Sequence, residues 1–200
     1  MKKFITKTMI WQKFRKTKFY QFIKPFHGFT IRLRFINWLV HHLIYKTQGL
    51  SFSLHFTSRI TNADKVILGN NVWFSLAVNG GCYIGGANGI EIGDDTIIAS
   101  GVKLISSNHD LQDYSKYTKN EPIRIGKRCW LGVNCIILPG VQLGDEVIVG
   151  AGAVVTKSFD SRSVIAGVPA RTIKKLTHEG QIHILIKAES EEQHGSNIYN

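Results

Sequence analysis

The chain has few cysteines and few prolines, and a secreted disulfide scaffold is excluded first. Its three cysteines in 200 residues do not form a Cys-x-x-Cys or a Cys/His ligand pattern, which favours a reducing compartment. For the same reason we expect no metal site. Four prolines and 44% hydrophobic residues argue against disorder away from the two ends and allow one substantial core.

Long apolar runs are also missing. The longest charge-free apolar run near the N-terminus, Phe35 to Tyr45, has eleven residues, whereas a helix that spans a bilayer needs about 20. Lys7, Lys13 and Arg15 interrupt any apolar stretch that a secretory signal would need. The sequence therefore predicts a cytoplasmic protein.

Acidic residues are absent from the first 63 positions. This segment holds twelve Lys or Arg, and the first acidic residue is Asp64, whereas residues 64–200 carry thirteen basic and fourteen acidic residues. The near-neutral remainder offers no continuous basic groove, so we expect no nucleic-acid partner despite a net charge of +11. Aromatic and basic residues alternate in residues 1–49. They suit either a helical cap or peripheral contact with an anionic membrane, and the sequence favours neither.

A six-residue period runs through the chain from residue 50. Such a period fits short strands joined by tight turns, three strands to a coil, and neither a helix nor simple alternation. Cys129 and Cys135 fall on inward positions, where free cysteine behaves as a small apolar residue. The positions that recur, with their companions four residues later, include Leu68, Val72, Phe74, Val78, Gly80, Gly86, Ile92, Ile98 and Leu104, and then Ile125, Leu131, Ile137, Leu143, Val149 and Val155.

The period breaks once, between Leu104 and Ile125, because these residues are 21 apart. Residues 106–122 must therefore leave the stack as a loop. His109 stands at its root, after Asn108, which we predict to be the last inward position. A histidine there is suited to general-base chemistry. Position alone favours a purely structural histidine equally, and a dyad with the neighbouring Asp110 is not favoured.

The phrases "IGDDTI", "IGKRCWLG", "LGDEVIVGAGAVVTK" and "IAGVPARTIKKL" resemble the hexapeptide-repeat acyltransferases. Within that family the sequence is most similar to the sugar and polysaccharide O-acetyltransferases. The resemblance implies an all-β fold, a left-handed parallel β-helix over residues 50–176. Residues 1–49 would form the helical cap, and residues 177–200 a tail after a short C-terminal helix. Only the resemblance implies the left hand, because parallel crossovers are generally right-handed.

The resemblance also implies a function and a site. We expect an acetyl-CoA-dependent O-acetyltransferase acting on a sugar or glycan, a homotrimer with His109 as the base, and Asn79 and Trp130 at the acceptor. N-acetylation of an amino sugar and a non-catalytic scaffold stay open as alternatives. Asn79 suits a turn equally well, and Lys174 suits an exposed face of the short terminal helix. The positions that match the family's contacts with acetyl-CoA are Val133, Ala151, Thr156, Lys157, Arg171 and Lys174.

Overall fold

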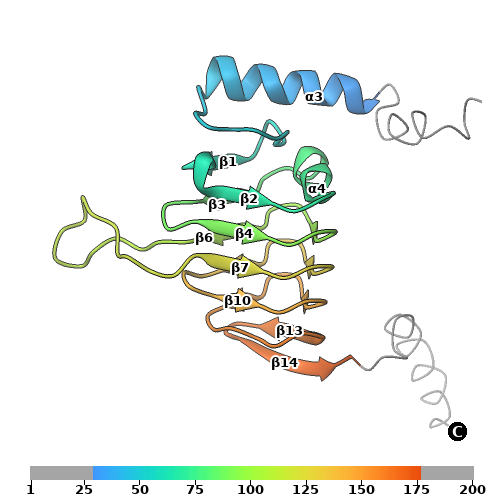
Figure 1. Ribbon diagram of the computed structural model, residues 1–200, viewed down its shortest axis with the longest axis vertical. Helices are drawn as coiled ribbons and strands as arrows, with labels where there is room; N and C mark the ends of the chain where they lie inside the picture. Colours follow the sequence, from blue (N-terminus) through green and yellow to red (C-terminus); the bar gives the residue numbers. More distant parts are fainter. Residues whose placement is uncertain (1–28, 177–200) are drawn as a thin grey trace, which may run out of the picture.

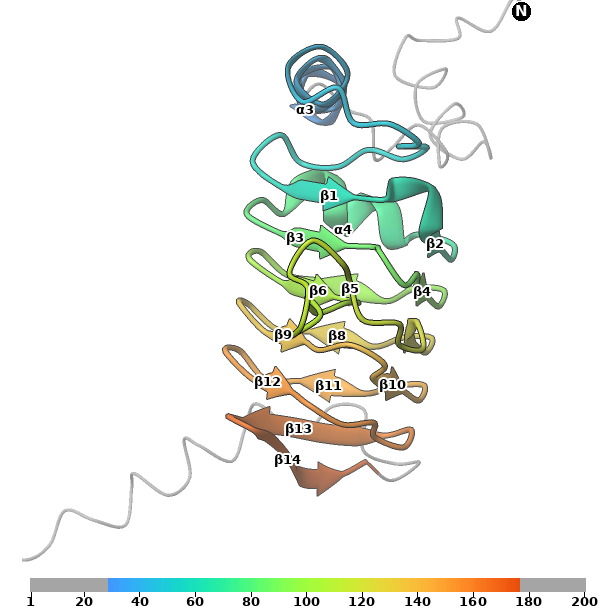
Figure 2. The ribbon, with the colours of Figure 1, turned by 90° about the vertical axis from the view of Figure 1, so that its left-hand side faces the viewer.

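The structure is a computed structural model that describes residues 29–176. Three sheets form the sides of a stack of coils, and successive strands pass from one sheet to the next (Figures 1 and 2). The first sheet has the order β1-β3-β6-β9-β12, the second β10-β7-β4-β2 and the third β14-β13-β11-β8-β5. All pairs are parallel except β13 with β14. The architecture is a three-sided parallel β-helix.

The strands are short, as the six-residue period predicts. Between them the chain turns at tight corners, several of which use residues with a positive φ, such as Asp95, Arg128 and Glu146. The strands are β1 (Arg59–Thr61), β2 (Val66–Leu68), β3 (Tyr83–Gly85), β4 (Ile90–Ile92), β5 (Ile97–Ile98), β6 (Lys103–Ile105), β7 (Ile123–Ile125), β8 (Trp130–Leu131), β9 (Ile136–Ile137), β10 (Gln142–Leu143), β11 (Ile148–Val149), β12 (Val154–Val155), β13 (Ser163–Gly167) and β14 (Ala170–Lys175).

Columns of aliphatic side chains fill the inside of the stack. In the first sheet Ile84 stacks on Leu104, Leu104 on Ile137 and Ile137 on Val155, and each of the four is at most 1% exposed. Each such side chain contributes about 1.5–3 kcal/mol relative to an exposed one. The core is therefore a continuous apolar column along the axis of the stack.

The three cysteines belong to this column. Cys82, Cys129 and Cys135 are buried and free, and burial raises the pKa of each thiol, that of Cys135 to about 12. A thiol with so high a pKa carries little thiolate at neutral pH, so none of them is suited to act as a nucleophile. The predicted core role of Cys129 and Cys135 is confirmed.

Two parts of the predicted period are wrong. Residues Val72–Val78 form a short helix, α4, whose buried residues Val72, Ser75 and Leu76 have helical spacing, while Phe74 is exposed. Further along, the inward pair of Cys82 and Ile84 is followed by Ile90 and Ile92, eight residues later instead of six. Two extra residues therefore sit in the corner at 86–89, and neither Gly80 nor Gly86 lies on a regular inward rung.

A helix lies across the N-terminal end of the stack (Figure 1). It is α3 (Phe29–Leu39), which continues into a π-helix, η2 (Val40–Ile44). A single 3-10 turn, η3 (Ala63–Lys65), follows in the first coil. This placement agrees with a helical cap, although residues 1–28 of the predicted cap lie outside the described residues. No helix within residues 29–176 is long and apolar enough to cross a membrane.

The C-terminal end is closed by a hairpin and not by a helix. Strand β14 pairs antiparallel with β13, so Lys174 and Lys175 lie in a strand, and the predicted short helix at these residues is wrong. Pairing with β14 satisfies the backbone groups of β13, which would otherwise form an open sheet edge. The rest of the predicted tail, residues 177–200, lies outside the described residues.

Candidate active site

The break in the period is an extruded loop, as predicted. Residues 106–122 leave the end of β6 and return at the start of β7, and they project well away from the stack (Figures 1 and 2). Backbone hydrogen bonds join the two arms of the loop: Thr118 N donates to Asn108 O at 2.8 Å and Asp110 N donates to Lys116 O at 3.0 Å. The loop is a short ribbon with a defined shape.

The root of this loop is fixed by two residues that the sequence did not single out. The Ser106 side chain is fully buried, and its Oγ donates to Gly85 O at 2.7 Å and accepts from Asn88 N at 2.9 Å. The Asn88 Nδ2 donates to Ser106 O at 2.8 Å and to Thr118 O at 2.9 Å, which belong to opposite arms. Asn88 therefore clamps the two arms together.

An irregularity in the sequence marks the position of Asn88. Asn88 lies in the corner at 86–89, where the inward pairs are two residues further apart than the period requires. Ser106 takes the last buried position before the loop, whereas Asn108 is exposed. The prediction that Asn108 is the last inward position is therefore wrong, and His109 lies out on the first arm of the loop.

His109 is held in one orientation by the loop itself. Its Nδ1 lies 2.7 Å from Tyr114 O, and its ring packs against that of Tyr117 with 4.7 Å between centroids. A backbone carbonyl can only accept a hydrogen bond, so Nδ1 carries the proton and Nε2 is left with a free lone pair. Asp110 Oδ1 accepts from Gln112 N, which gives a dyad with His109 no support.

The two predicted acceptor residues lie apart from this loop. Asn79 Nδ2 donates to Ile98 O at 2.9 Å, and its Oδ1 accepts from Ser100 Oγ at 3.3 Å, so its amide ties α4 to the neighbouring coil. Trp130 is 53% exposed on the third sheet, whereas the loop leaves the corner between the first and second sheets. A single chain does not bring Trp130 and His109 together.

The residues predicted to contact acetyl-CoA occupy the later coils. Val133 and Ala151 are exposed at stacked corners, joined by a hydrogen bond from Gly152 N to Val133 O of 2.8 Å. Thr156 and Lys157 are exposed just after β12. Arg171 and Lys174 are exposed on β14. These six positions share the C-terminal half of the stack, and their contact with a ligand stays a prediction.

Charged groups gather at the corner between the second and third sheets. Lys127 Nζ lies 3.1 Å from Asp94 Oδ2, and Glu146 binds both Arg128 and Arg162. The Arg128 hydrogen bond lowers the pKa of Glu146, and a hydrogen bond from the Asn70 backbone lowers that of Asp94. These pairs join successive coils and lie away from His109. Within residues 29–176 no group of His, Cys, Asp or Glu is arranged to hold a metal ion.

Comparison with known proteins decides the family. Residues 122–157 match the family model described as a hexapeptide repeat of succinyl-transferase. The chain is 34% identical over 148 residues to the putative lipopolysaccharide biosynthesis O-acetyl transferase WbbJ of Escherichia coli K12, over 67% of this chain and 76% of that protein. The chain belongs to the hexapeptide-repeat acetyltransferases. It is therefore an acyltransferase, as the sequence predicted.

Solved structures of hexapeptide-repeat acetyltransferases agree with the fold. A maltose O-acetyltransferase from Clostridium difficile 630 superposes with a TM-score of 0.56 at 25% identity, covering 82% of this chain and 91% of that one. A galactoside acetyltransferase solved in complex with coenzyme A gives a TM-score of 0.57 at 23% identity, over 75% and 82%. The predicted left-handed parallel β-helix is confirmed.

Proposed function

We propose that this acetyltransferase moves an acetyl group from acetyl-CoA to a hydroxyl of a sugar or surface polysaccharide, with His109 as the general base. The observation that carries the proposal is the contact between His109 Nδ1 and Tyr114 O. It places the free lone pair on Nε2, at an exposed position on a loop that leaves an otherwise regular stack. The choice of a glycan acceptor is supported by the relative named for lipopolysaccharide biosynthesis.

The proposed reaction is a direct transfer. His109 Nε2 takes the proton of the acceptor hydroxyl as its oxygen attacks the thioester carbon, and a tetrahedral oxyanion forms. Collapse of this intermediate breaks the carbon–sulfur bond, and the proton on Nε2 passes to the departing thiolate. The products are the acetyl ester and free CoA, and the histidine returns to its starting state. No covalent enzyme intermediate is needed, in line with the buried, protonated cysteines.

The separation of His109 from Trp130 supports a site that is shared between chains. We infer a homotrimer in which the loop of one subunit faces the third sheet of its neighbour. Trp130 would then line the acceptor site. Acetyl-CoA would be contacted by the six exposed positions of the later coils, which are Val133, Ala151, Thr156, Lys157, Arg171 and Lys174. Arg171 and Lys174 carry the positive charge that the phosphates of CoA require.

The test is a transfer assay with the full chain, acetyl-CoA and a panel of galactosides, maltose, capsular oligosaccharides and O-antigen fragments. Thiol release measures turnover, and mass spectrometry identifies the product. We expect His109→Ala to lower kcat by about 10²–10⁴-fold while the KM for acetyl-CoA stays within about threefold. The exposed His42 serves as the matched control, and His42→Gln should retain activity.

Two results would contradict the proposal. Full transfer by His109→Ala would reject the base, whatever the acceptor. A product that resists hydroxylamine would be an amide and not an ester, and it would replace O-acetylation with N-acetylation of an amino sugar. Gel filtration with light scattering tests the homotrimer, which a monomer that is fully active would exclude.

A further inference from the structure

The cap helix α3 and the π-helix η2 carry their large apolar side chains on the outside. Six such residues are at least 42% exposed, and we call them the cap face. A soluble helix that covers the end of a core normally shows the reverse arrangement, with apolar residues inward and polar residues outward. Exposed apolar side chains gathered on one helix mark a candidate contact site. The cap face consists of Ile31, Phe35, Ile36, Trp38, Leu43 and Ile44.

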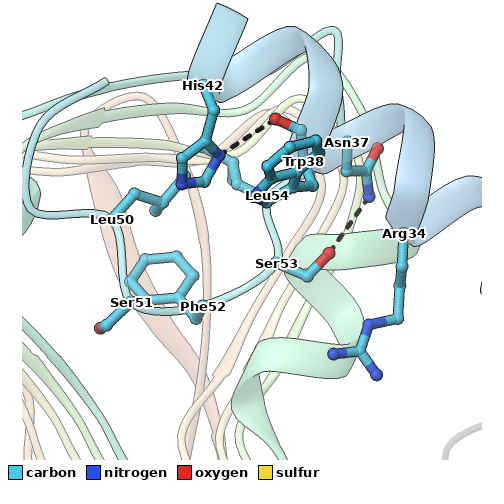
Figure 3. A pocket seen from close by; sticks show the side chains of 9 residues that line it. All are labelled: Arg34, Asn37, Trp38, His42, Leu50, Ser51, Phe52, Ser53 and Leu54. Carbon is cyan, nitrogen blue, oxygen red and sulfur yellow. Dashed lines mark hydrogen bonds between the residues drawn. The ribbon is translucent and has the colours of Figure 1, made fainter. Parts of the chain in front are cut away.

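The inward face of the helix combines one apolar residue with two polar residues. Leu33, Asn37 and His41 are buried at four-residue spacing. Asn37 Nδ2 donates to Ala77 O at 3.0 Å, and its Oδ1 accepts from Phe56 N at 2.9 Å; Figure 3 shows Asn37 reaching Ser53. His41 Nε2 lies 3.2 Å from His55 O. Hydrogen bonds thus hold the helix on the stack, and most of its apolar side chains contribute little to that packing.

Aromatic rings form a ridge along the cap face. Phe35 stacks on Trp38 with 6.2 Å between centroids, and Trp38 stacks on His42 with 5.3 Å. Trp38 and His42 also line a cavity of about 270 Å³ beside the helix, next to Leu50 and Phe52 (Figure 3). Rings that combine an apolar body with a polar edge are favoured at the boundary between lipid and water.

The positive charge of the N-terminal segment favours an anionic partner for the cap face. Residues 1–63 carry twelve Lys or Arg and no Asp or Glu, and Arg32 and Lys46 are exposed beside the cap face. Such a segment is attracted to anionic headgroups. No helix of the described residues is long and apolar enough to cross a membrane. An amphipathic helix with an exposed apolar face and basic neighbours binds by lying along a membrane surface.

We propose that the cap face docks this enzyme on the surface of an anionic lipid bilayer. The apolar side chains enter the boundary between headgroups and acyl chains, and the basic residues of this end of the chain pair with anionic headgroups. For a cytoplasmic enzyme this surface is the inner face of the membrane. The proposal does not depend on the acceptor or on His109, because it rests on the opposite faces of α3 and on the charge of residues 1–63.

The experiment is vesicle flotation of the full chain. Vesicles of phosphatidylcholine alone are compared with vesicles containing phosphatidylglycerol, at low and high NaCl. We expect binding only to the anionic vesicles, and loss of that binding at high salt. The double variant Phe35→Ser/Trp38→Ser should bind at least tenfold more weakly at low salt. The matched control is Ile173→Ser, an equally exposed residue at the opposite end of the stack, which should bind like the wild type.

Each other outcome overturns the proposal. If the double variant binds like the wild type, the basic residues act without the cap face. If the wild type does not bind and the double variant changes the oligomeric state in gel filtration, a second copy of the chain covers the cap face. Circular dichroism of the double variant checks that its fold is retained. Phe35 is 60% exposed and Trp38 is 50% exposed, so the thermal midpoint of the double variant is compared with that of the wild type, and binding is scored only for protein that is folded.

Discussion

Substitution of Asn88 tests the link between the root of the loop and the proposed base, His109. Asn88→Ala removes two hydrogen bonds, to Ser106 O and to Thr118 O. Each is worth about 0.5–1.5 kcal/mol net, so the closed arrangement of the two arms loses about 1–3 kcal/mol. If this loss shifts the equilibrium toward an open loop, His109 is out of position for most of the time. We expect kcat to fall between about fivefold and about 160-fold, at 1.36 kcal/mol per factor of ten.

Two readouts separate this role from a general loss of stability. The loop contains Lys116 and Lys119, so limited trypsin digestion should cut Asn88→Ala faster in the loop, while the thermal midpoint of the stack changes little. The KM for acetyl-CoA should not change. The matched control is Asn120→Ala, which removes one bond within the loop, to Thr118 Oγ1, and should keep kcat within about twofold. An Asn88→Ala enzyme with wild-type kcat and wild-type digestion would refute the clamp.

Further predictions concern the stability of the stack and its cap. Burial lowers the pKa of His41 below its usual 6.5. The contribution of neutral His41 to the free energy of unfolding is therefore complete above pH 6.5 and is lost as the pH falls below it, because the unfolded chain takes up the proton first. The thermal midpoint at pH 5.5 should fall less in His41→Gln than in the wild type, with His42→Gln behaving like the wild type. Ile137→Ala should lower the unfolding free energy by about 2–5 kcal/mol in urea denaturation. Ile136→Ala, at its half-buried neighbour, should lower it clearly less. Equal losses would contradict the placement of Ile137 in the buried column of the first sheet. Cys135→Ala should leave transfer activity intact, since its thiol is buried and protonated, and complete inactivation of a folded variant would point to a covalent intermediate.

The sequence predicted the fold where each coil repeats its neighbour. From Ile90 to Val155 the inward pairs are aliphatic or small, and the phase count is correct on both sides of the loop. After Val155 it is wrong, because Phe159 pairs with Leu143 and Ile165 with Val149, 16 residues apart and not 18. The six-residue period failed at Val72–Val78, because a seven-residue helix can also place apolar residues six positions apart. The prediction failed again at Lys174, because the segment joins a strand only through β13, and no local pattern reveals that partner.

The candidate site was predictable only in part, for a similar reason. His109 stands where the period breaks, and that break is visible in the chain itself. Asn88 acts on residues 18 and 30 positions away, so its role appears only once coils are stacked. Trp130 lies on the third sheet, whereas His109 lies on the loop between the first and second sheets, so no contact within one chain relates the two. Local spacing therefore reveals where the loop and His109 lie, and three-dimensional contacts reveal what holds them.

The stack closes directly beneath the loop. Ile90 pairs with Ile123, and Leu104 pairs with Ile137 although 33 residues separate them, against 18 between Ile137 and Val155. The coils before and after the loop pair with each other as regularly as the other coils do. The length of the loop can therefore change at a modest entropic cost. The tip of the loop, beyond His109 and the two arms that Asn88 joins, can change in length and sequence without disturbing the coils. The scaffold, the core and the opposite end of the molecule would stay as they are.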